Sequence, residues 1–503
     1  MKASRWLAFI LAGWTLLACA SLPEVDADRA KARASAVPEV VSAKGKLPRQ
    51  TTEQLLKKRW AKSTLDLKGQ AALEEAATGV PLIAGNKVQL LFDGPQTMTE
   101  MMKAIAAAKD HINFETYIFD QDELGMKFAE LLIQKQREGV VVNVIYDSVG
   151  TIGVPQEFFD HMKAGGVKLL AFNPINPAKA RGNGWKLNNR DHRKMLIVDG
   201  KVGFAGGINI SDTYSKSSPF RGGLGGNGKP GGSGGSGIGS GAGSGIGFGI
   251  GSGIGSGIGS GVGSGGGHQP LTEDDVGWRD THVRIEGPAV QAMQWLFVQA
   301  WIEQDADDLR DAKYFLQVPP VGDKVVRVLG SRPEGRFEIY KAMLLAMQEA
   351  RKSIHITCAY FVPDAQTMEA LTDAARRGVE VQLVLPSVSD SGLVFHAGRA
   401  FYQPLLEAGV KIYELKLSVL HAKTVVIDGV WSTVGSTNLD RRSFLHNSEM
   451  NVIVMGDVFG LEMEKAFKED LHNSREITLV EWNRRPLSNR VKEWLARVWD
   501  YWL

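Results

Sequence analysis

The sequence of 503 residues contains only two cysteines, Cys19 and Cys358. Two thiols exclude a disulfide framework and a zinc site built from cysteines. An excess of charge of one sign is also lacking, because 58 basic side chains are balanced by 56 acidic ones and the formal net charge is +2. Such a chain gives no global electrostatic reason to expect a nucleic acid partner. The hydrophobic share of 44% and the charged share of 23% exclude disorder throughout.

The apolar run at the N-terminus, residues 6–18, is shorter than the roughly 20 residues of a membrane-spanning helix. Lys2 and Arg5 precede it, as in a secretory signal. The run ends Leu-Leu-Ala-Cys19, which resembles the lipobox of bacterial lipoproteins. We therefore expect residues 1–18 to be a signal peptide and Cys19 to be acylated; a plain signal peptide with an incidental cysteine is the alternative. Ala20 after the cysteine favours, by the same resemblance, an anchor in the outer membrane that faces the periplasm of a bacterial cell envelope.

The composition of two segments predicts that they contribute little to the hydrophobic core. Of the 57 glycines, 26 lie between Gly222 and Gly267, in repeats of Gly-Ile-Gly-Ser type. This composition buries too little apolar surface to offset the entropy of ordering, so we interpret residues 222–267 as a flexible surface insertion. The alternative is that this insertion gates the access of substrate or contacts lipid. Residues 19–77 are rich in Ala, Lys, Glu and Asp and predict a tether, with room for a helix.

The rest of the chain repeats itself. The strand-like run 112–119 matches 354–361, and each is followed by a helical stretch, a glycine (Gly139 and Gly378) and another strand. Strand–helix–strand order indicates parallel pairing and the α/β class. A further matched block is an acid seven residues before a glycine, at Asp280 and at Glu449. We therefore predict two copies of one domain, residues 78–320 and 321–485, with the glycine-rich segment inserted into the first.

The closest match is the pattern His-x-Lys-x4-Asp-x6-Gly-(Gly/Ser)-x-Asn. It occurs at His192, Lys194, Asp199, Gly207 and Asn209, and again at His421, Lys423, Asp428, Ser436 and Asn438. The histidine and lysine are two residues apart on a strand and share a face. The aspartates fall at a predicted hairpin turn, so they are either catalytic or turn formers.

Imidazoles, ammonium groups and backbone donors from two copies suit a phosphoryl site. Lysines neutralise the phosphate oxygens, while the two imidazoles flank phosphorus for an in-line displacement. No His/Asp/Glu spacing of the zinc type is present, so we expect no metal and no cofactor.

The paired motifs resemble the HKD motifs of the phospholipase D superfamily, and the chain is similar to bacterial cardiolipin synthases. Further blocks that carry this likeness include Tyr117-Ile-Phe, Tyr360-Phe-Val-Pro-Asp, Trp278-Arg-Asp and Asn438-Leu-Asp-Arg-Arg-Ser. The likeness covers residues 78–485, apart from the glycine-rich segment. It implies two α/β halves that face each other across a pseudo-twofold axis, with the active site between them.

The resemblance also implies roles without a metal. His192 would attack the phosphodiester and form a phosphohistidine, while His421 would protonate the leaving alkoxide and then deprotonate the incoming alcohol. The symmetry of the motifs leaves the reverse assignment open. Phosphate oxygens would be bound by both motifs, through Lys194, Lys423, Asn209, Asn438, Gly207 and Ser436. Asp280 and Glu449 would orient the imidazoles, each from its own half; an ordinary salt bridge is the alternative.

Three functions compete. The first is transfer of a phosphatidyl group to phosphatidylglycerol, which makes cardiolipin, with phosphatidylglycerol or phosphatidylethanolamine as donor at a membrane surface. The second is hydrolysis of phospholipids to phosphatidic acid. The third is a nuclease or phosphodiesterase, which the near-neutral charge and the lack of a basic arm disfavour.

The C-terminal stretch, residues 486–503, predicts an amphipathic helix. Its apolar residues Val491, Trp494, Leu495, Val498 and Trp502 are at helical spacing, and Arg490, Lys492 and Arg497 lie on other faces. Tryptophan with cationic neighbours suits a bilayer interface. Packing of the apolar face onto the protein itself is the alternative.

Overall fold

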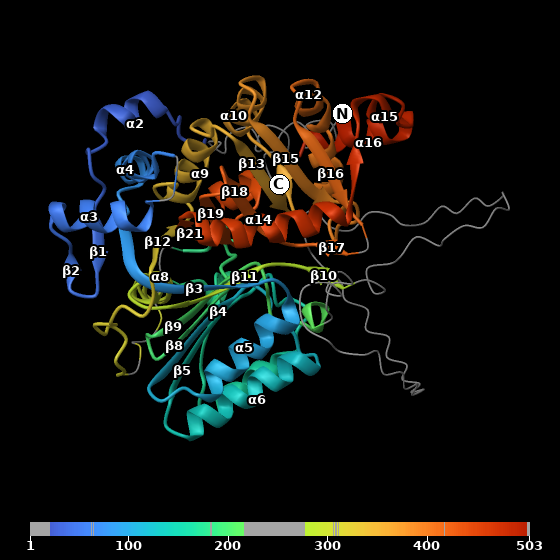
Figure 1. Cartoon of the computed structure of the whole chain (residues 1–503). Helices are drawn as coiled ribbons and strands as arrows, with labels where there is room; N and C mark the ends of the chain where they lie inside the picture. The colour runs from blue at the N-terminus through green and yellow to red at the C-terminus, as the bar shows by residue number, and fades with distance from the viewer. Residues whose placement is uncertain are drawn as a thin grey trace, which may run out of the picture.

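The apolar runs of the first half form a mixed sheet, shown with the rest of the chain in Figure 1. The computed structural model describes residues 21–499 except 62, 64, 182, 183, 216–276, 305, 307, 308, 310 and 417. The first sheet has the order β3 (Leu82–Leu91), β11 (His282–Glu286), β9 (Val202–Gly206), β8 (Met195–Val198), β4 (His111–Thr116), β5 (Val141–Asp147), β6 (Lys168–Phe172). Cys19, the expected signal peptide and the segment 222–267 lie outside the described residues.

Helices cover both faces of this sheet. One face packs on α5 (Gly94–Ala106), α6 (Glu123–Arg137) and α7 (Gln156–Ala164), and the other on α8 (Val290–Glu303). Strands β4, β5 and β6 are parallel, as the strand–helix–strand order predicts.

The second half repeats the arrangement strand for strand. Its sheet has the order β12 (Lys324–Ser331), β21 (Asn447–Met455), β19 (Trp431–Gly435), β18 (Lys423–Ile427), β13 (Ser353–Cys358), β15 (Glu380–Pro386), β16 (Lys411–Leu415), and β22 (Ser474–Ile477) is added at the edge. One face packs on α9 (Glu338–Gln348), α10 (Ala365–Arg376) and α12 (Tyr402–Glu407), and α14 (Asp457–His472) lies on the other.

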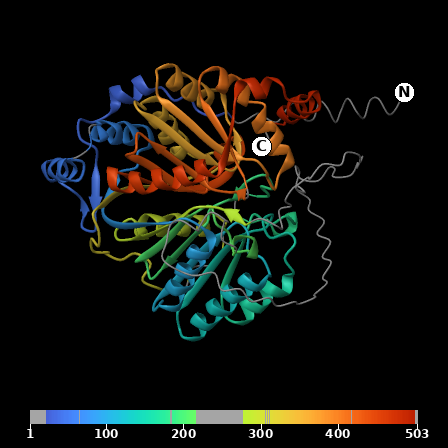
Figure 2. The ribbon, with the colours of Figure 1, turned by 45° about the vertical axis from the view of Figure 1, so that its right-hand side comes forward.

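The two halves form one body (Figure 2). Strands β3 and β12 pair antiparallel, with Val326 opposite Ile83. A common core between the halves includes Val283 and Phe297 of the first and Met463 of the second, all at most 2% exposed. The predicted class, two similar α/β halves, is confirmed.

The segment predicted as a tether is folded where the structure describes it. It contains α2 (Ala27–Arg33), β1 (Val40–Ser42), β2 (Gly45–Lys46), α3 (Arg49–Arg59) and α4 (Leu67–Thr78). Val40 and Leu56 are buried in the core of the second half, and Trp60 donates its indole N–H to the carbonyl oxygen of Met455 at 3.2 Å. The tether prediction is therefore wrong for residues 21–77, because a few well-spaced apolar side chains dock an otherwise polar segment.

Short elements complete the fold. They are η1 (Pro177–Lys179), β7 (Arg190–Asp191), η2 (Asp212–Tyr214), β10 (Trp278–Arg279), β14 (Phe361–Val362), α11 (Gly392–Arg399), β17 (Val419–Leu420), β20 (Leu439–Asp440), α13 (Arg441–Leu445), α15 (Leu479–Asn483) and α16 (Leu487–Arg497). Two of their pairings cross between the halves, because β10 pairs with β17 and β7 pairs with β21. Among the helices that the structure describes, none combines the length and hydropathy needed to cross a membrane.

Candidate active site

The two motif histidines lie at the seam between the halves. The backbone N–H of His192 donates to the carbonyl oxygen of Ser448 at 2.9 Å, and that of His421 donates to the carbonyl oxygen of Arg279 at 2.8 Å. Each histidine is therefore held by a strand of the opposite half. Their side chains keep 11% and 7% of their surface exposed, so neither imidazole is fully buried.

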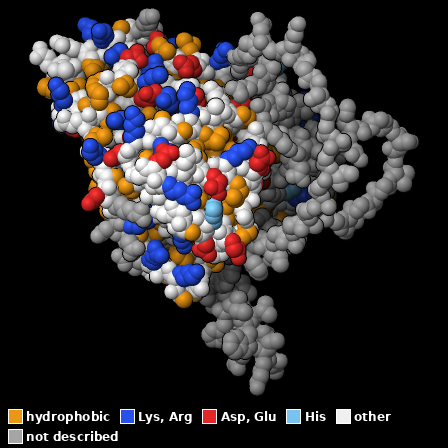
Figure 3. Space-filling model, turned by 90° about the horizontal axis from the view of Figure 1, so that it is seen from below, with side chains coloured by type: hydrophobic (Ala, Val, Ile, Leu, Met, Phe, Trp, Pro, Cys, Tyr) orange, Lys and Arg blue, Asp and Glu red, His pale blue; other side chains and the backbone are white. Residues whose placement is uncertain are grey.

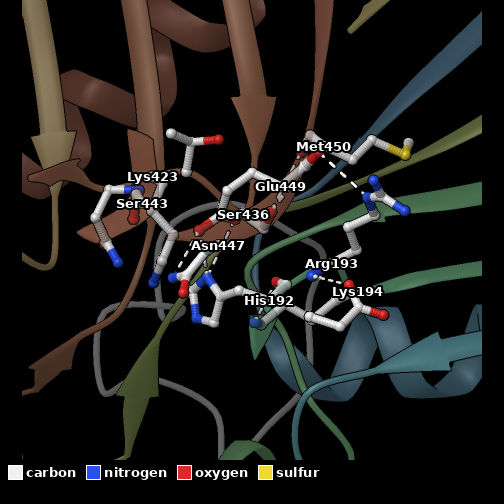
Figure 4. Close-up of polar contacts among 12 residues, drawn as sticks. His192, Arg193, Lys194, Lys423, Ser436, Ser443, Asn447, Glu449 and Met450 are labelled. Carbon is white, nitrogen blue, oxygen red and sulfur yellow. Dashed lines mark hydrogen bonds and ion pairs between the residues drawn. The ribbon is translucent and has the colours of Figure 1, made fainter. Parts of the chain in front are cut away.

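The carboxylates that orient the imidazoles are exchanged between the halves. His192 Nδ1 lies 2.9 Å from Glu449 Oε1, and His421 Nδ1 lies 2.7 Å from Asp280 Oδ2. Figure 4 shows Glu449 of β21 beside His192, which lies between β7 and β8. The expectation that each acid serves its own half is wrong, because the crossed pairs β7–β21 and β10–β17 bring each acid beside the other half's histidine.

Gly207 and Ser436 contact these carboxylates rather than an open phosphate site. A Cβ atom at Gly207 would lie 2.2 Å from Asp280 Oδ1, so only glycine leaves room for the carboxylate. At the matching position, the Ser436 hydroxyl donates to Glu449 Oε2. The expected phosphate-binding role of these two residues is therefore replaced by a supporting role for the acids.

The motif lysines are fixed by their own strands. Lys194 Nζ donates to the carbonyl oxygen of His192 at 2.6 Å, and Lys423 Nζ donates in the same way to His421. Each ammonium group has three donors, so both keep N–H groups for a phosphate. The two lysines remain phosphate-binding candidates.

The asparagines differ from one another. The Asn209 amide accepts from the Ile118 N–H at 3.1 Å and donates to the Tyr214 hydroxyl at 3.1 Å, so it is engaged within the first half. The side-chain oxygen of Asn438 is buried without a hydrogen-bond partner among the described residues. The atom left without a partner at Asn438 is an acceptor, so it suits a ligand hydroxyl rather than a phosphate oxygen.

Asp199 and Asp428 lie at the hairpin turns, away from the histidines. Asp199 accepts hydrogen bonds from the backbone N–H groups of residues 109–111, and Asp428 from those of residues 351–353. Both have positive φ values, +52° and +55°. The expectation that they are catalytic does not hold, because each closes its turn at the far end of the motif strand.

The electrostatics distinguish the two histidine–acid pairs. Burial and the charges of Lys194 and Lys423 hold the pKa of His192 well below its usual range. The pKa of His421 is lowered by the same causes, burial and Lys423, but Asp280 opposes the change.

The two acids differ in the opposite sense. Burial raises the pKa of Glu449 to about 7. Burial acts in the same direction on Asp280, but the charge of His421 and its hydrogen bond outweigh it and leave the pKa of Asp280 lowered. The pair His421–Asp280 is therefore the one suited to hold a proton on the imidazole.

The lysines also have lowered pKa values. Burial lowers the pKa of Lys194 to about 7, and Lys423 adds to the effect. The pKa of Lys423 is likewise lowered by burial. A phosphodiester anion between the two ammonium groups would reverse this change, which is the behaviour of a site built for an anion.

Aromatic side chains around the histidines were missed as site residues from the sequence. The ring of Tyr117 lies 5.2 Å from that of His192, and the ring of Tyr360 lies 6.3 Å from that of His421. Their matching positions in the two repeats were a usable signal. Tyr214 and Trp278 also contact His421, at 5.8 and 5.3 Å between ring centroids. These two residues do not occupy matching positions in the two repeats, so the repeat gave no signal for them.

Other titratable clusters give little support to a metal site. Among the described residues, no group of three or more His, Cys, Asp or Glu side chains is arranged to hold a metal ion. Cys358 is a free, buried thiol whose pKa is raised to about 12 by burial.

Comparison with known proteins identifies relatives over most of the chain. The family described as cardiolipin synthase, PLD-like domain, matches residues 101–217 and 343–471, one region in each half. Cardiolipin synthase 2 of Bacillus anthracis is 32% identical over 415 residues, which are 82% of this chain and 70% of the relative. The major cardiolipin synthase ClsA of Bacillus subtilis is 32% identical over 416 residues, 82% of this chain and 74% of the relative. In fold, the chain is similar to the crystal structure of a phosphatidylserine synthase from Haemophilus influenzae, with a TM-score of 0.57 at 12% identity over 84% of this chain and 96% of that one.

Proposed function

Because the chain belongs to the cardiolipin synthase family of phospholipase D-like proteins, we propose that it transfers a phosphatidyl group from one phospholipid to the hydroxyl of phosphatidylglycerol. The observation that carries this proposal is the exchange of His192–Glu449 and His421–Asp280 across the seam. The charges of Lys194, Lys423 and His421 all act on His192, which supports a single site with one imidazole and one lysine from either half.

The first step forms a phosphohistidine. His192 Nε2 attacks phosphorus, the bond between phosphorus and the leaving oxygen breaks, and His421 gives its proton to that oxygen. With phosphatidylglycerol as donor, free glycerol leaves. Lys194 and Lys423 stabilise the charge that builds on the phosphate oxygens.

The second step reverses the first with another alcohol. His421, now neutral, takes the proton from the terminal hydroxyl of a second phosphatidylglycerol. The resulting oxygen attacks phosphorus, the bond to His192 breaks, and cardiolipin is released. The same step with water would give phosphatidic acid, so the competition between the two acceptors is an outcome that the assay measures.

The electrostatic difference between the two pairs supports His192 as the nucleophile. A nucleophilic imidazole must be neutral, which suits the strongly lowered pKa of His192. A general acid must hold a proton, and Asp280, whose own pKa is lowered, stabilises the imidazolium of His421. These differences favour His192 over His421 as the nucleophile.

Charge supports a lipid rather than a nucleic acid substrate. On the face shown in Figure 3, basic and acidic side chains are interspersed, without the field of one sign that a duplex needs. Together with the formal net charge of +2, this favours the phosphatidyl transfer.

We also propose that the protein works at a membrane of the cell envelope, held there by acylation of Cys19 and facing the periplasm, in the outer membrane. The Leu-Leu-Ala-Cys19 sequence supports this location. Metabolic labelling with a radioactive fatty acid tests it: the wild type should be labelled and Cys19→Ser should not. An unlabelled wild-type protein would contradict the anchor.

Purified protein given labelled phosphatidylglycerol, with or without phosphatidylethanolamine, should form cardiolipin, resolved by thin-layer chromatography. His192→Ala and His421→Ala should each reduce turnover by about 10³-fold or more. His161→Ala is the matched control, because His161 lies at the surface beside Glu130 and should leave turnover unchanged. Phosphatidic acid as the sole product would replace transfer by hydrolysis, and no lipid product would refute both.

A leaving group that needs no proton separates the two histidines. With phosphatidyl-p-nitrophenol, His421→Ala should release a stoichiometric burst of nitrophenol, since only the first step is required. His192→Ala should release none. The reverse pattern would assign the nucleophile to His421.

A further inference from the structure

The C-terminal helix α16 buries polar and small residues and exposes its apolar face, the reverse of what a surface helix of a globular protein usually does. Glu493 and Ala496 are its buried residues, at 2% and 3% exposure. Leu487, Trp494 and Val498, by contrast, are 74%, 68% and 69% exposed. An amphipathic helix of a globular protein buries its apolar stripe, and this one presents that stripe to the outside.

A polar contact explains why the helix is held in this orientation. The Glu493 carboxylate accepts a hydrogen bond from Arg485 Nε at 2.9 Å and lies 3.7 Å from Nε of Arg399 on α11. The inward face is therefore fixed by an ion-pair network, and Ala496 gives α11 a close approach. In the part of the chain that the structure describes, the apolar face of α16 is not packed on the protein.

The outward face is one continuous stripe. At about 100° per residue, Leu487, Val491, Trp494, Leu495, Val498 and Trp499 cover about 140° of the circumference of the helix. All six are at least 42% exposed. A contiguous exposed apolar stripe of this kind is typical of a surface that binds another protein or a membrane.

The charges beside the stripe favour a membrane as the surface that covers it. Arg490 and Arg497 border the stripe on one side and Lys492 borders it on the other, and all three are exposed. The only acidic residue between 487 and 499 is Glu493, which is buried and paired. An apolar stripe with tryptophan, bordered by cations alone, matches a bilayer that contains anionic phospholipids.

The helix also lies beside the rim of the active site. Its partner α11 follows Asp390, which accepts a hydrogen bond from the Tyr360 hydroxyl at 2.6 Å. Tyr360 in turn contacts His421. Figures 1 and 2 both show α15 and α16 together at one edge of the second half. A membrane that covers α16 therefore lies on the side of the second half from which α11, Asp390 and Tyr360 lead to His421.

We propose that α16 docks the enzyme on the surface of an anionic bilayer, in the plane of the headgroups, and so presents the active site to its lipid substrates. This inference rests on the proposed function for the nature of the substrate. The docking itself needs only the exposed stripe and its cations.

A fluorescent label tests the docking directly. In the full chain with Cys19→Ser, Cys358 stays unreactive because it is buried, so an environment-sensitive dye reacts only with a new cysteine. Val498→Cys places the dye on the stripe. Leu461→Cys is the matched control, since Leu461 is 67% exposed on α14, outside the stripe. Vesicles of phosphatidylglycerol and phosphatidylethanolamine should shift the emission of the Val498→Cys dye to the blue and protect it from iodide about fivefold or more. The Leu461→Cys dye should not change.

Three results would overturn the docking. The dye at Val498→Cys could stay accessible to iodide on vesicles that carry the protein, or the protein could fail to bind these vesicles. It could also be protected without vesicles in a concentration-dependent way, which would assign the stripe to a second copy of the chain or another protein.

A charge variant links docking to turnover. Arg490→Glu with Lys492→Glu should lower turnover of phosphatidylglycerol in vesicles about tenfold or more at low salt and leave turnover of a dispersed short-chain phosphatidylglycerol unchanged. Equal losses on both substrates would show a structural defect and overturn the docking. If the wild type turns over neither substrate, the proposed function fails, while the dye result still decides the docking.

Discussion

Glu449→Gln is expected to abolish turnover and at the same time to stabilise the protein at neutral and alkaline pH. Burial raises the pKa of Glu449 to about 7, whereas a glutamate in an unfolded chain titrates near 4.3. Between these values the native state holds a proton that the unfolded state has released. The free energy of unfolding of the wild type therefore falls as the pH rises through this window, by about 4 kcal/mol in all. Glutamine does not titrate, so the variant escapes this loss.

The loss of turnover follows from the tautomer of His192. The Glu449 carboxylate accepts a hydrogen bond from the Nδ1–H group and so keeps the lone pair on Nε2, where the nucleophile is needed. A glutamine amide can donate to Nδ1 instead, which places the proton on Nε2. A comparable change of tautomer in a catalytic triad lowers turnover about 10⁴-fold, and we expect a loss of about 10³- to 10⁴-fold here.

Asp280→Asn is the matched control, for which we expect the free energy of unfolding to change in the opposite direction. The charge and hydrogen bond of His421 lower the pKa of Asp280 against the effect of burial. Its carboxylate therefore contributes stability above the pKa of an unfolded aspartate, near 3.9, and this contribution is lost as the pH falls through the native pKa. The asparagine variant should be inactive as well, but less stable than the wild type at neutral pH.

Urea unfolding between pH 5 and pH 9 measures both effects, with cardiolipin formation assayed on the same samples. The stability advantage of Glu449→Gln should grow as the pH rises and should level off above pH 8. A variant that is less stable than the wild type at pH 8, or a shift of the same sign in Asp280→Asn, would refute the electrostatic account of the two pairs.

Three further predictions follow from single contacts. Asp199→Ala removes the acceptor of three backbone N–H groups and should lower the free energy of unfolding by about 1–3 kcal/mol; turnover of the folded protein should be unchanged, and a tenfold loss would restore the catalytic reading. Gly207→Ala puts a methyl group into the Asp280 carboxylate and should lower turnover about 10²-fold, measured on folded protein; wild-type turnover would show that Asp280 can move freely. Arg279→Met leaves Asp470 buried and unpaired across the seam and should cost about 3–5 kcal/mol in urea unfolding; a neutral result would show that the halves are held by their apolar core alone.

The class and the motif residues could be predicted because they depend on short-range patterns. Strand–helix–strand order and the repeat of the His-x-Lys pattern are properties of neighbouring residues, and they place His192 and His421 at matching positions. The spacing also predicts that Asp199 lies at a turn, and its positive φ in the structure confirms that position.

The partner of each histidine could not be predicted in the same way. Asp280 and Glu449 have the same spacing from a glycine in each copy, and that spacing is identical whether an acid serves its own half or the other. Only the pairing of β10 with β17 and of β7 with β21 decides it. Likewise, the inward face of α16 depends on Arg399, which is far away in sequence.

The exchange of the acids makes the two halves one enzyme rather than two. A duplicated domain with its own acid would carry a complete His-Lys-acid set in each copy, and the copies could act separately. Here each imidazole takes its carboxylate and a backbone acceptor from the opposite half, so neither half alone holds an oriented histidine. The symmetric exchange also allows a division of labour. Asp280, whose pKa is lowered, stabilises a proton on His421, whereas the strongly lowered pKa of His192 keeps that imidazole neutral beside Glu449. In the proposed reaction the two imidazoles would flank phosphorus for an in-line displacement, and the difference between the two histidine–acid pairs would set its direction.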